Sequence, residues 1–408
     1  MLVFSGELNG YLRPCECTKP MLGGMARRGS LLKSLAAASG IIKVENGDLV
    51  QERGAQNEIK AETLVDMLSA MKYDVFVPGE KDFKLGMPVL RSLQERFSGK
   101  FLCANVKIDG HPLFTGTVEK IINLSGTPIK ILLIGLFSER YTAALHAFDN
   151  GLNIEPPVIA LQRLKSRFSR CNYKVVVLHG DETEARDLAA HFPDLSMILY
   201  AHAPVAPLAP IVVGHTTLAY CGERGRSIKI ADLQVFVPAS MPRIREVSLG
   251  QSWKDNPGIT LLKRDYSTRV KRENLLEHQI QLRPANGPAF AGSAACAPCH
   301  QNAYQVWQSS SHSHALKTLE VKGDDRDPEC TSCHVVGWKE SGGFISRITT
   351  PQLANVGCES CHGPAKAHVL DNKRPPAGDS KGSCRNCHIS EHSPGFVFQS
   401  YWSHIKHL

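Results

Sequence analysis

The chain has 408 residues, more than one ordinary hydrophobic core supports, and this length indicates two or three domains. Its hydrophobic content of 42% is that of a globular protein, and no apolar run approaches the roughly 20 residues of a membrane-spanning helix. The formal net charge of +8 belongs to the front region and linker, because residues 291–408 hold 11 Lys and Arg against 10 Asp and Glu. We interpret this excess as a solvated surface, with docking to an acidic partner or an anionic surface as the alternative. No motif supports nucleic-acid binding.

Residues 1 to about 248 alternate short β-branched runs with stretches whose apolar residues repeat at helical spacing. This alternation predicts an α/β layered domain with a largely buried sheet and functional loops at the strand ends. Strands are predicted at 41–45, 74–77, 101–106, 129–137, 174–179, 197–202 and 211–214. Helices are predicted at 58–71, 89–97, 158–168 and 183–191.

The composition changes at residues 250–291, where Lys and Arg clusters precede an apolar group around Leu275 and Leu276 and then a Pro- and Gly-rich stretch. We interpret this segment as a basic linker with one amphipathic helix. Residues 292–408 hold ten of the 17 histidines and few apolar positions, so they do not easily form a conventional core. The predicted domains are therefore 1–249, 250–291 and 292–408.

Eight of the 13 cysteines lie in four C-x-x-C-H motifs of the last segment. Two thiols at this spacing reach the two vinyl groups of one porphyrin, and the adjacent imidazole lies under the iron as proximal ligand. Zinc is the alternative, but a zinc site does not need a His after every second Cys. The sequence predicts four covalently attached haem c groups, whose bulk would supply the missing apolar volume. The motifs are Cys296, Cys299 and His300; Cys330, Cys333 and His334; Cys358, Cys361 and His362; Cys384, Cys387 and His388.

The sixth position of each iron decides its chemistry, because a second imidazole closes the site whereas an open position permits small-molecule binding. The segment offers more histidines than four irons require, and mostly bis-histidine ligation is expected. The available histidines are His312, His314, His368, His392, His404 and His407.

Three runs in this segment, at 307–315, 358–368 and 401–407, resemble the tetrahaem cytochromes that collect electrons from hydroxylamine oxidoreductase. The resemblance covers about residues 292–408 and implies closely packed haems that serve as an electron conduit. It implies distal ligands at His314, His368 and His407. The fourth distal ligand stays open: His312, His392 and His404 are candidates, each also suited to a surface or propionate-contacting role, and one haem of this family type can lack a protein distal ligand.

The resemblance also bears on location, because c-type haem is attached outside the cytoplasm in bacteria. No secretory apolar region precedes the first strand-like segment. We therefore expect an export signal upstream of Met1 and a periplasmic or cell-surface location.

The front region resembles the metallophosphoesterase domain of periplasmic 5'-nucleotidases, with matching pieces at 4–12, 22–28, 45–48, 77–82, 177–180 and 201–204. Activity in that family requires two metal ions that clamp a phosphoryl group. Several ligands are altered, and a lysine ammonium opposes metal binding, so we expect a vestigial metal site without phosphoesterase activity. At the family's ligand positions, Glu7 replaces an Asp, Asn9 replaces a His, Glu80 replaces an Asn, and Lys81 and Pro204 each replace a His. The ligands that this chain keeps are Asp48, His179 and His202.

Five cysteines remain outside the haem motifs. Cys15 and Cys17 follow the first strand, in the loop that would overhang the former metal centre. They are candidate redox-active or metal-binding thiols, and the alternative is a C-x-C on a surface turn. Cys103, Cys171 and Cys221 have apolar neighbours and are predicted to be buried small hydrophobes.

The leading functional hypothesis is an extracytoplasmic electron carrier that exchanges electrons with partner proteins and uses its α/β domain for docking or assembly. One alternative is an oxidoreductase whose substrate binds at an open haem or at the Cys15 and Cys17 loop. Another is a homo-oligomer or haem-stacked polymer in which His404 and His407 ligate a neighbouring iron. The last is a metal-dependent phosphoesterase.

Overall fold

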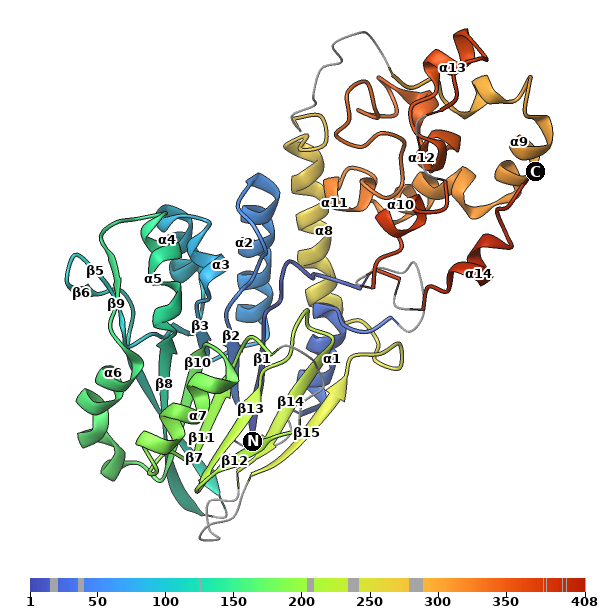
Figure 1. Cartoon of the computed structure of the whole chain (residues 1–408). Helices are drawn as coiled ribbons and strands as arrows, with labels where there is room; N and C mark the ends of the chain where they lie inside the picture. Colours follow the sequence, from blue (N-terminus) through green and yellow to red (C-terminus); the bar gives the residue numbers. More distant parts are fainter. Residues whose placement is uncertain are drawn as a thin grey trace. The chain divides into compact units, whose positions relative to one another are not determined.

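The computed structural model describes the chain except residues 15–20, 36–39, 125, 204–208, 234–241, 279–288, 377, 379, 391, 394 and 408. The chain divides into two compact units, one of Met1–Pro14 with Leu22–Lys263 and one that includes Arg264–Leu408 (Figure 1). Within the described ranges no helix is long and apolar enough to cross a membrane. The candidate thiols Cys15 and Cys17, and Pro204, lie outside the described residues.

The first unit is built on two six-stranded sheets and a small three-stranded sheet. The first sheet has the order β15 (Arg243–Ser248), β14 (Ser227–Asp232), β1 (Leu2–Gly6), β2 (Ile42–Asn46), β3 (Val75–Val77) and β4 (Lys100–Phe101). The second has the order β12 (Ile211–Val213), β13 (Thr216–Tyr220), β11 (Met197–Tyr200), β10 (Tyr173–His179), β8 (Thr127–Phe137) and β7 (Thr117–Leu124). The third has the order β6 (His111–Pro112), β5 (Val106–Ile108) and β9 (Leu152–Ile154).

The main core of this unit is formed by side chains from both six-stranded sheets. Successive residues of a strand point to opposite faces, so in β10 Val175 and Val177 enter the core shared with the first sheet. Val176 and Leu178 point the other way and pack with apolar residues of the helices on that face. The strand is thus buried on both faces, which explains its continuous apolar run.

Helices complete the layers and confirm the predicted α/β layered fold (Figure 1). The predicted strand at 101–106 is wrong in its extent: β4 ends at Phe101 and β5 begins at Val106. Between them, the Asn105 side chain donates to the backbone oxygens of Phe137 and Glu155 and thereby fixes a non-strand segment. The helices of this unit are α1 (Met25–Leu35), α2 (Ala55–Ala70), α3 (Glu80–Phe83), α4 (Met87–Arg96), α5 (Thr142–His146), α6 (Pro157–Leu164) and α7 (Glu182–His191).

The second unit consists of short helices and turns around a small apolar cluster that includes Leu276, Phe290, Leu316 and Phe344. Helix α8 (Pro257–Arg272) has residues in both units, since the first unit ends at Lys263, and Leu275 and Leu276 follow this helix in a turn. The other helices are α9 (Gln301–Ser309), α10 (Ala315–Lys322), α11 (Pro328–Thr331), α12 (Cys358–His362), α13 (Lys366–Leu370) and α14 (Phe398–Trp402). Cys103, Cys171 and Cys221, in the first unit, are buried, which confirms that prediction.

Candidate functional site

The polar residues singled out in the first unit come together where parallel strands end. Asp48 follows β2, Glu80 begins α3 shortly after β3, His179 ends β10 and His202 follows β11. The carboxyl ends of parallel strands are the usual place for such sites, because the loops that leave them are free of the sheet's hydrogen bonds. The structure therefore brings together residues that are up to 154 positions apart in the sequence.

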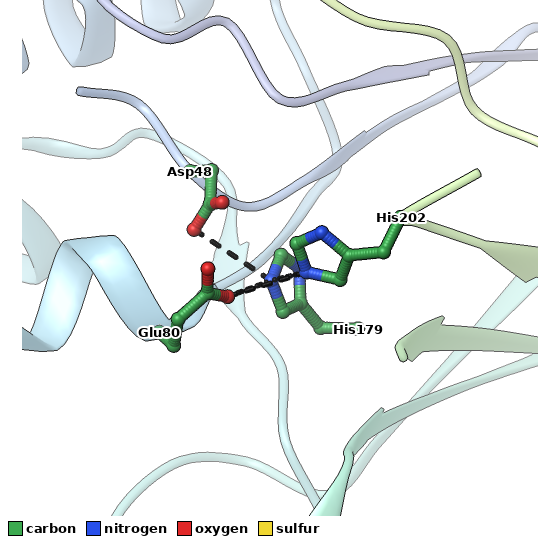
Figure 2. A group of neighbouring side chains, drawn as sticks. All are labelled: Asp48, Glu80, His179 and His202. Carbon is green, nitrogen blue, oxygen red and sulfur yellow. Dashed lines mark hydrogen bonds and ion pairs between the residues drawn. The ribbon is translucent and has the colours of Figure 1, made fainter. Parts of the chain in front are cut away.

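Two imidazoles and two carboxylates face one another in this cluster (Figure 2). His179 Nε2 lies 2.7 Å from Glu80 Oε2 and 2.9 Å from His202 Nε2. His202 Nε2 lies 3.3 Å from Glu80 Oε2, and Asp48 Oδ1 lies 3.6 Å from His179 Nε2. We call these four residues the His/carboxylate cluster.

Lys81 sits on the other side of Asp48. Its Nζ donates to Asp48 Oδ2 at 2.7 Å and to Asn9 Oδ1 at 3.2 Å. Its backbone N–H also donates to Asp48 Oδ1. The Asp48 carboxylate thus faces an ammonium with one oxygen and the imidazole of His179 with the other.

Glu7 supports His202 from the side away from the cluster. Glu7 Oε1 lies 3.1 Å from His202 Nδ1, and Glu7 Oε2 accepts from the backbone N–H of His202 and from the Tyr220 hydroxyl. Sequence reasoning did not identify Tyr220 or the rings that flank the imidazoles: Phe137 stacks on His179, and Tyr141 lies beside His202. Single aromatic residues in strands and loops carry no local signal for such a role.

The backbone is strained at this site. Glu7, Asn9, Asp48 and His202 have φ values of 50°, 51°, 56° and 52°, in the left-handed region that residues with a side chain seldom adopt. Gly79 is required for close approach, because a Cβ there would overlap Asp48 Oδ1 and His179. Strain of this kind persists only where the surrounding fold enforces it, and it concentrates at functional sites.

The charges of the cluster are strongly coupled. Burial opposes ionisation of Glu80, but hydrogen bonds from His179 and His202 outweigh it and hold the pKa of this carboxyl below its ordinary value. Burial also opposes protonation of His202, yet its bonds to Glu7 and Glu80 raise the pKa of this imidazole to about 10. Burial raises the pKa of Asp48. The carboxylates of Glu7 and Glu80 thus favour a protonated His202, and a metal ion that used this imidazole as a ligand would have to displace its proton.

The four C-x-x-C-H motifs lie in or beside helical turns of the second unit. A helical turn places residues i and i+3 on one side, so both thiols of a motif face the same way. The backbone N–H of His300 donates to the oxygen of Cys296, and that of His388 to the oxygen of Cys384, as in a helix. This local geometry presents two thiols and one imidazole to a common space.

Three of the four motif histidines face a second imidazole. The ring centroids of His300 and His368 are 6.0 Å apart, those of His362 and His407 are 5.8 Å apart, and those of His312 and His388 are 6.3 Å apart. A metal-bound imidazole nitrogen lies about 2.0–2.1 Å from the ion, so the centroids of two imidazoles on opposite sides of one ion are roughly 6.3 Å apart. The pairs therefore fit an iron held between two axial histidines.

The remaining histidines have other partners. His334 Nδ1 lies 2.6 Å from the backbone oxygen of Ala315, the kind of hydrogen bond that orients a ligating imidazole. Among the described residues His334 makes no close ring contact with another imidazole, although His312 lies near enough for the two charges to interact. His314 lies beside Ser313 and His404 beside the Ser400 carbonyl. The resemblance implied His314 as a distal ligand, and this stays a prediction; the structure places the ring of His312, two residues earlier, beside that of His388.

The motifs also lie close to one another in pairs. The thiols of Cys296 and Cys358 are hydrogen-bonded, which lowers the pKa of Cys358 to about 6. Cys387 likewise interacts with Cys333. The first motif thus adjoins the third, and the second adjoins the fourth, as closely packed haems require.

These features describe a two-part chain, an α/β unit with a cluster of histidines and carboxylates at its strand ends and a segment that carries four C-x-x-C-H motifs. Residues 295–363 match the family model of cytochrome c554 and c-prime. Cytochrome c-554 of Nitrosomonas europaea is 31% identical over 109 residues, which are 23% of this chain and 46% of that protein. The chain thus spans about half the length of this curated relative. Cytochromes of this class carry covalently bound haem and transfer electrons.

Solved structures resemble the chain in fold. The 5'-nucleotidase precursor of Thermus thermophilus has a TM-score of 0.57 at 16% identity, over 79% of this chain and 67% of that one. The sulfate thiohydrolase SoxB of the same organism has a TM-score of 0.56 at 16% identity, over 74% of this chain and 67% of that one. The calcineurin-like phosphoesterase YfkN of Bacillus subtilis has a TM-score of 0.55 at 15% identity, over 66% of this chain and 96% of that one. At these identities the likeness establishes the metallophosphoesterase fold alone.

Proposed function

We propose that the protein is an extracytoplasmic electron carrier whose second unit holds four covalently attached haem c groups, with the α/β unit as a docking or assembly module. The observation that carries this proposal is the set of three imidazole pairs, in each of which one member is the histidine of a C-x-x-C-H motif. Haem c supplies reversible one-electron chemistry when it is bound.

The protein's own residues would attach and orient these groups. The two thiols of each motif would form the thioether links, and His300, His334, His362 and His388 would be the proximal ligands. His368, His407 and His312 would be distal ligands to the first, third and fourth groups. The hydrogen bond from His334 to the Ala315 carbonyl would fix the tautomer that leaves Nε2 free for the metal.

A count of haem and iron on the purified protein tests this proposal. We expect four irons and four thioether-linked haems per chain by pyridine haemochrome and intact-mass measurements, and a low-spin c-type spectrum for most of them. We also expect no phosphate release from nucleotides with added divalent metal. A count below four, or hydrolysis lost in His202→Ala, would contradict the proposal in this form.

A second function is favoured by one observation, the surroundings of His334. Among the described side chains, His334 is the motif histidine with no facing imidazole ring, so its metal position would remain open to a small molecule. In this alternative the protein is an oxidoreductase with its substrate at the second motif. A high-spin ferric signal together with substrate-dependent reoxidation of the reduced protein would support it; an entirely low-spin spectrum would exclude it.

A further inference from the structure

We propose that the α/β unit binds one divalent transition-metal ion at the His/carboxylate cluster, and that the Lys81 ammonium takes the place of a second ion. The fold is that of two-metal enzymes, but the residues present here suit one ion only. The proposal concerns the first unit alone and does not depend on the electron-transfer function of the second.

The donor atoms of the cluster have the spacing of a single coordination sphere. Atoms bound about 2.0–2.2 Å from one ion lie roughly 2.9–3.5 Å from one another. The distances among His179 Nε2, His202 Nε2 and Glu80 Oε2 are 2.7, 2.9 and 3.3 Å, and Asp48 Oδ1 lies 3.6 Å from His179 Nε2. Two of these distances fall in the range and two lie just outside it, so small side-chain shifts would seat the four atoms around one ion. Two imidazoles with two carboxylates favour zinc, iron(II) or manganese(II) over calcium or magnesium, which prefer oxygen ligands alone.

The supporting residues are those that a metal-bound histidine requires. Such a histidine usually donates its second ring N–H to a carboxylate, and His202 Nδ1 faces Glu7 Oε1 at 3.1 Å. Glu7 is in turn held by the Tyr220 hydroxyl. His179 is fully buried against Phe137 and its Nε2 faces the cluster, but among the described residues its Nδ1 has no hydrogen-bond partner, so packing rather than a second hydrogen bond orients this ring.

Lys81 explains why the second position would take no ion. Its ammonium lies between Asp48 Oδ2 and Asn9 Oδ1, the two oxygens that would otherwise bridge to or bind that ion. The ammonium forms an ion pair with Asp48 Oδ2 at 2.7 Å and lies 3.9 Å from Glu80 Oε1, so two carboxylates hold it in place. A permanent positive charge in this place excludes a second cation by direct repulsion.

The cavity beside the cluster suits the entry of a cation. It has a volume of about 620 Å³, and His202 lines it together with four carboxylates, those of Glu7, Asp181, Glu182 and Glu223. Three of these carboxylates are paired with arginines, Asp181 with Arg140, Glu182 with Arg186 and Glu223 with Arg226, and Glu7 is paired with His202. The cavity therefore gives an ion a route to His202 through a polar lining.

Zinc binding to the full-length haem-loaded protein tests the proposal. The protein is stripped with a chelator, loaded with Zn²⁺ and analysed for zinc and iron by mass spectrometry, with affinity measured by calorimetry. We expect one zinc per chain. His202→Ala and Glu80→Gln should each weaken the affinity by at least about 100-fold with unchanged haem spectra, and the exposed His191→Ala on α7 is the matched control.

Lys81→Met separates the two halves of the proposal. Removal of the ammonium should tighten zinc binding by about tenfold or more, since a neighbouring positive charge is lost. If the wild-type protein bound zero or two zinc ions per chain, or if His202→Ala bound zinc as tightly as the wild type, the single-ion site would be overturned. Unchanged or weaker binding in Lys81→Met would overturn the role of the lysine. The iron count is read separately, so failure of the haem proposal is distinguishable.

Discussion

Replacement of His312 by alanine should open one iron of the second unit. The His312 and His388 rings are 6.3 Å apart, and burial together with the charges of His388 and His334 lowers the pKa of His312, which keeps it neutral and able to bind a metal. With three imidazole pairs and four motifs, about one haem in four is expected to be high-spin in the wild type, and about two in four in His312→Ala. Electron paramagnetic resonance of the oxidised protein measures this fraction.

His314→Ala is the matched control, because His314 lies two residues away and faces no imidazole among the described residues. It should leave the spin state unchanged, and added imidazole should return the His312→Ala spectrum to low spin. If His314→Ala produced the high-spin signal and His312→Ala did not, the distal ligand would be the one that the sequence resemblance implied. The reasoning from ring separation would then be refuted.

Three further changes test other parts of the structure. Arg28→Met should destabilise the α/β unit by about 3–5 kcal/mol in urea unfolding, because it leaves Glu45 buried without its cation; an unchanged midpoint would contradict this. Burial raises the pKa of Glu45 even beside Arg28, and loss of the cation raises it further. Above the ordinary pKa of a carboxyl the folded variant then keeps a proton that the unfolded chain has already released, so the deficit should grow from pH 5 to pH 8. Ser393→Ala removes the partner 3.0 Å from His388 Nδ1 and should shift the reduction potential of one haem in a redox titration, without loss of haem; four unshifted potentials would show that the bond is unimportant. Gly79→Ala should abolish zinc binding, because its Cβ would displace the cluster's carboxylate, and retention of full affinity would show that the cluster tolerates movement.

Local patterns were sufficient for much of this protein. The continuous apolar run of β10 and the helical spacing of α7 predicted those elements, since strand and helix periodicity follow from nearby residues alone. The C-x-x-C-H motifs predicted a covalent haem segment, because all the reacting groups of one site lie within five residues. The interpretation of Glu7, Asn9 and Lys81 as part of a vestigial metal site came from the family resemblance and stays a prediction.

Only the tertiary structure decided how distant groups meet. It placed Lys81 against Asp48 and Asn9, joined His179 and His202 to Glu80, and paired His312 with His388 across 76 positions of chain. No sequence periodicity distinguishes His312 from His314, because both lie in one irregular turn and their directions depend on the packing of that turn. The sequence thus determined which chemical groups are present, and the fold determined their partners, because packing of strands and turns sets the positions of side chains far apart in the chain.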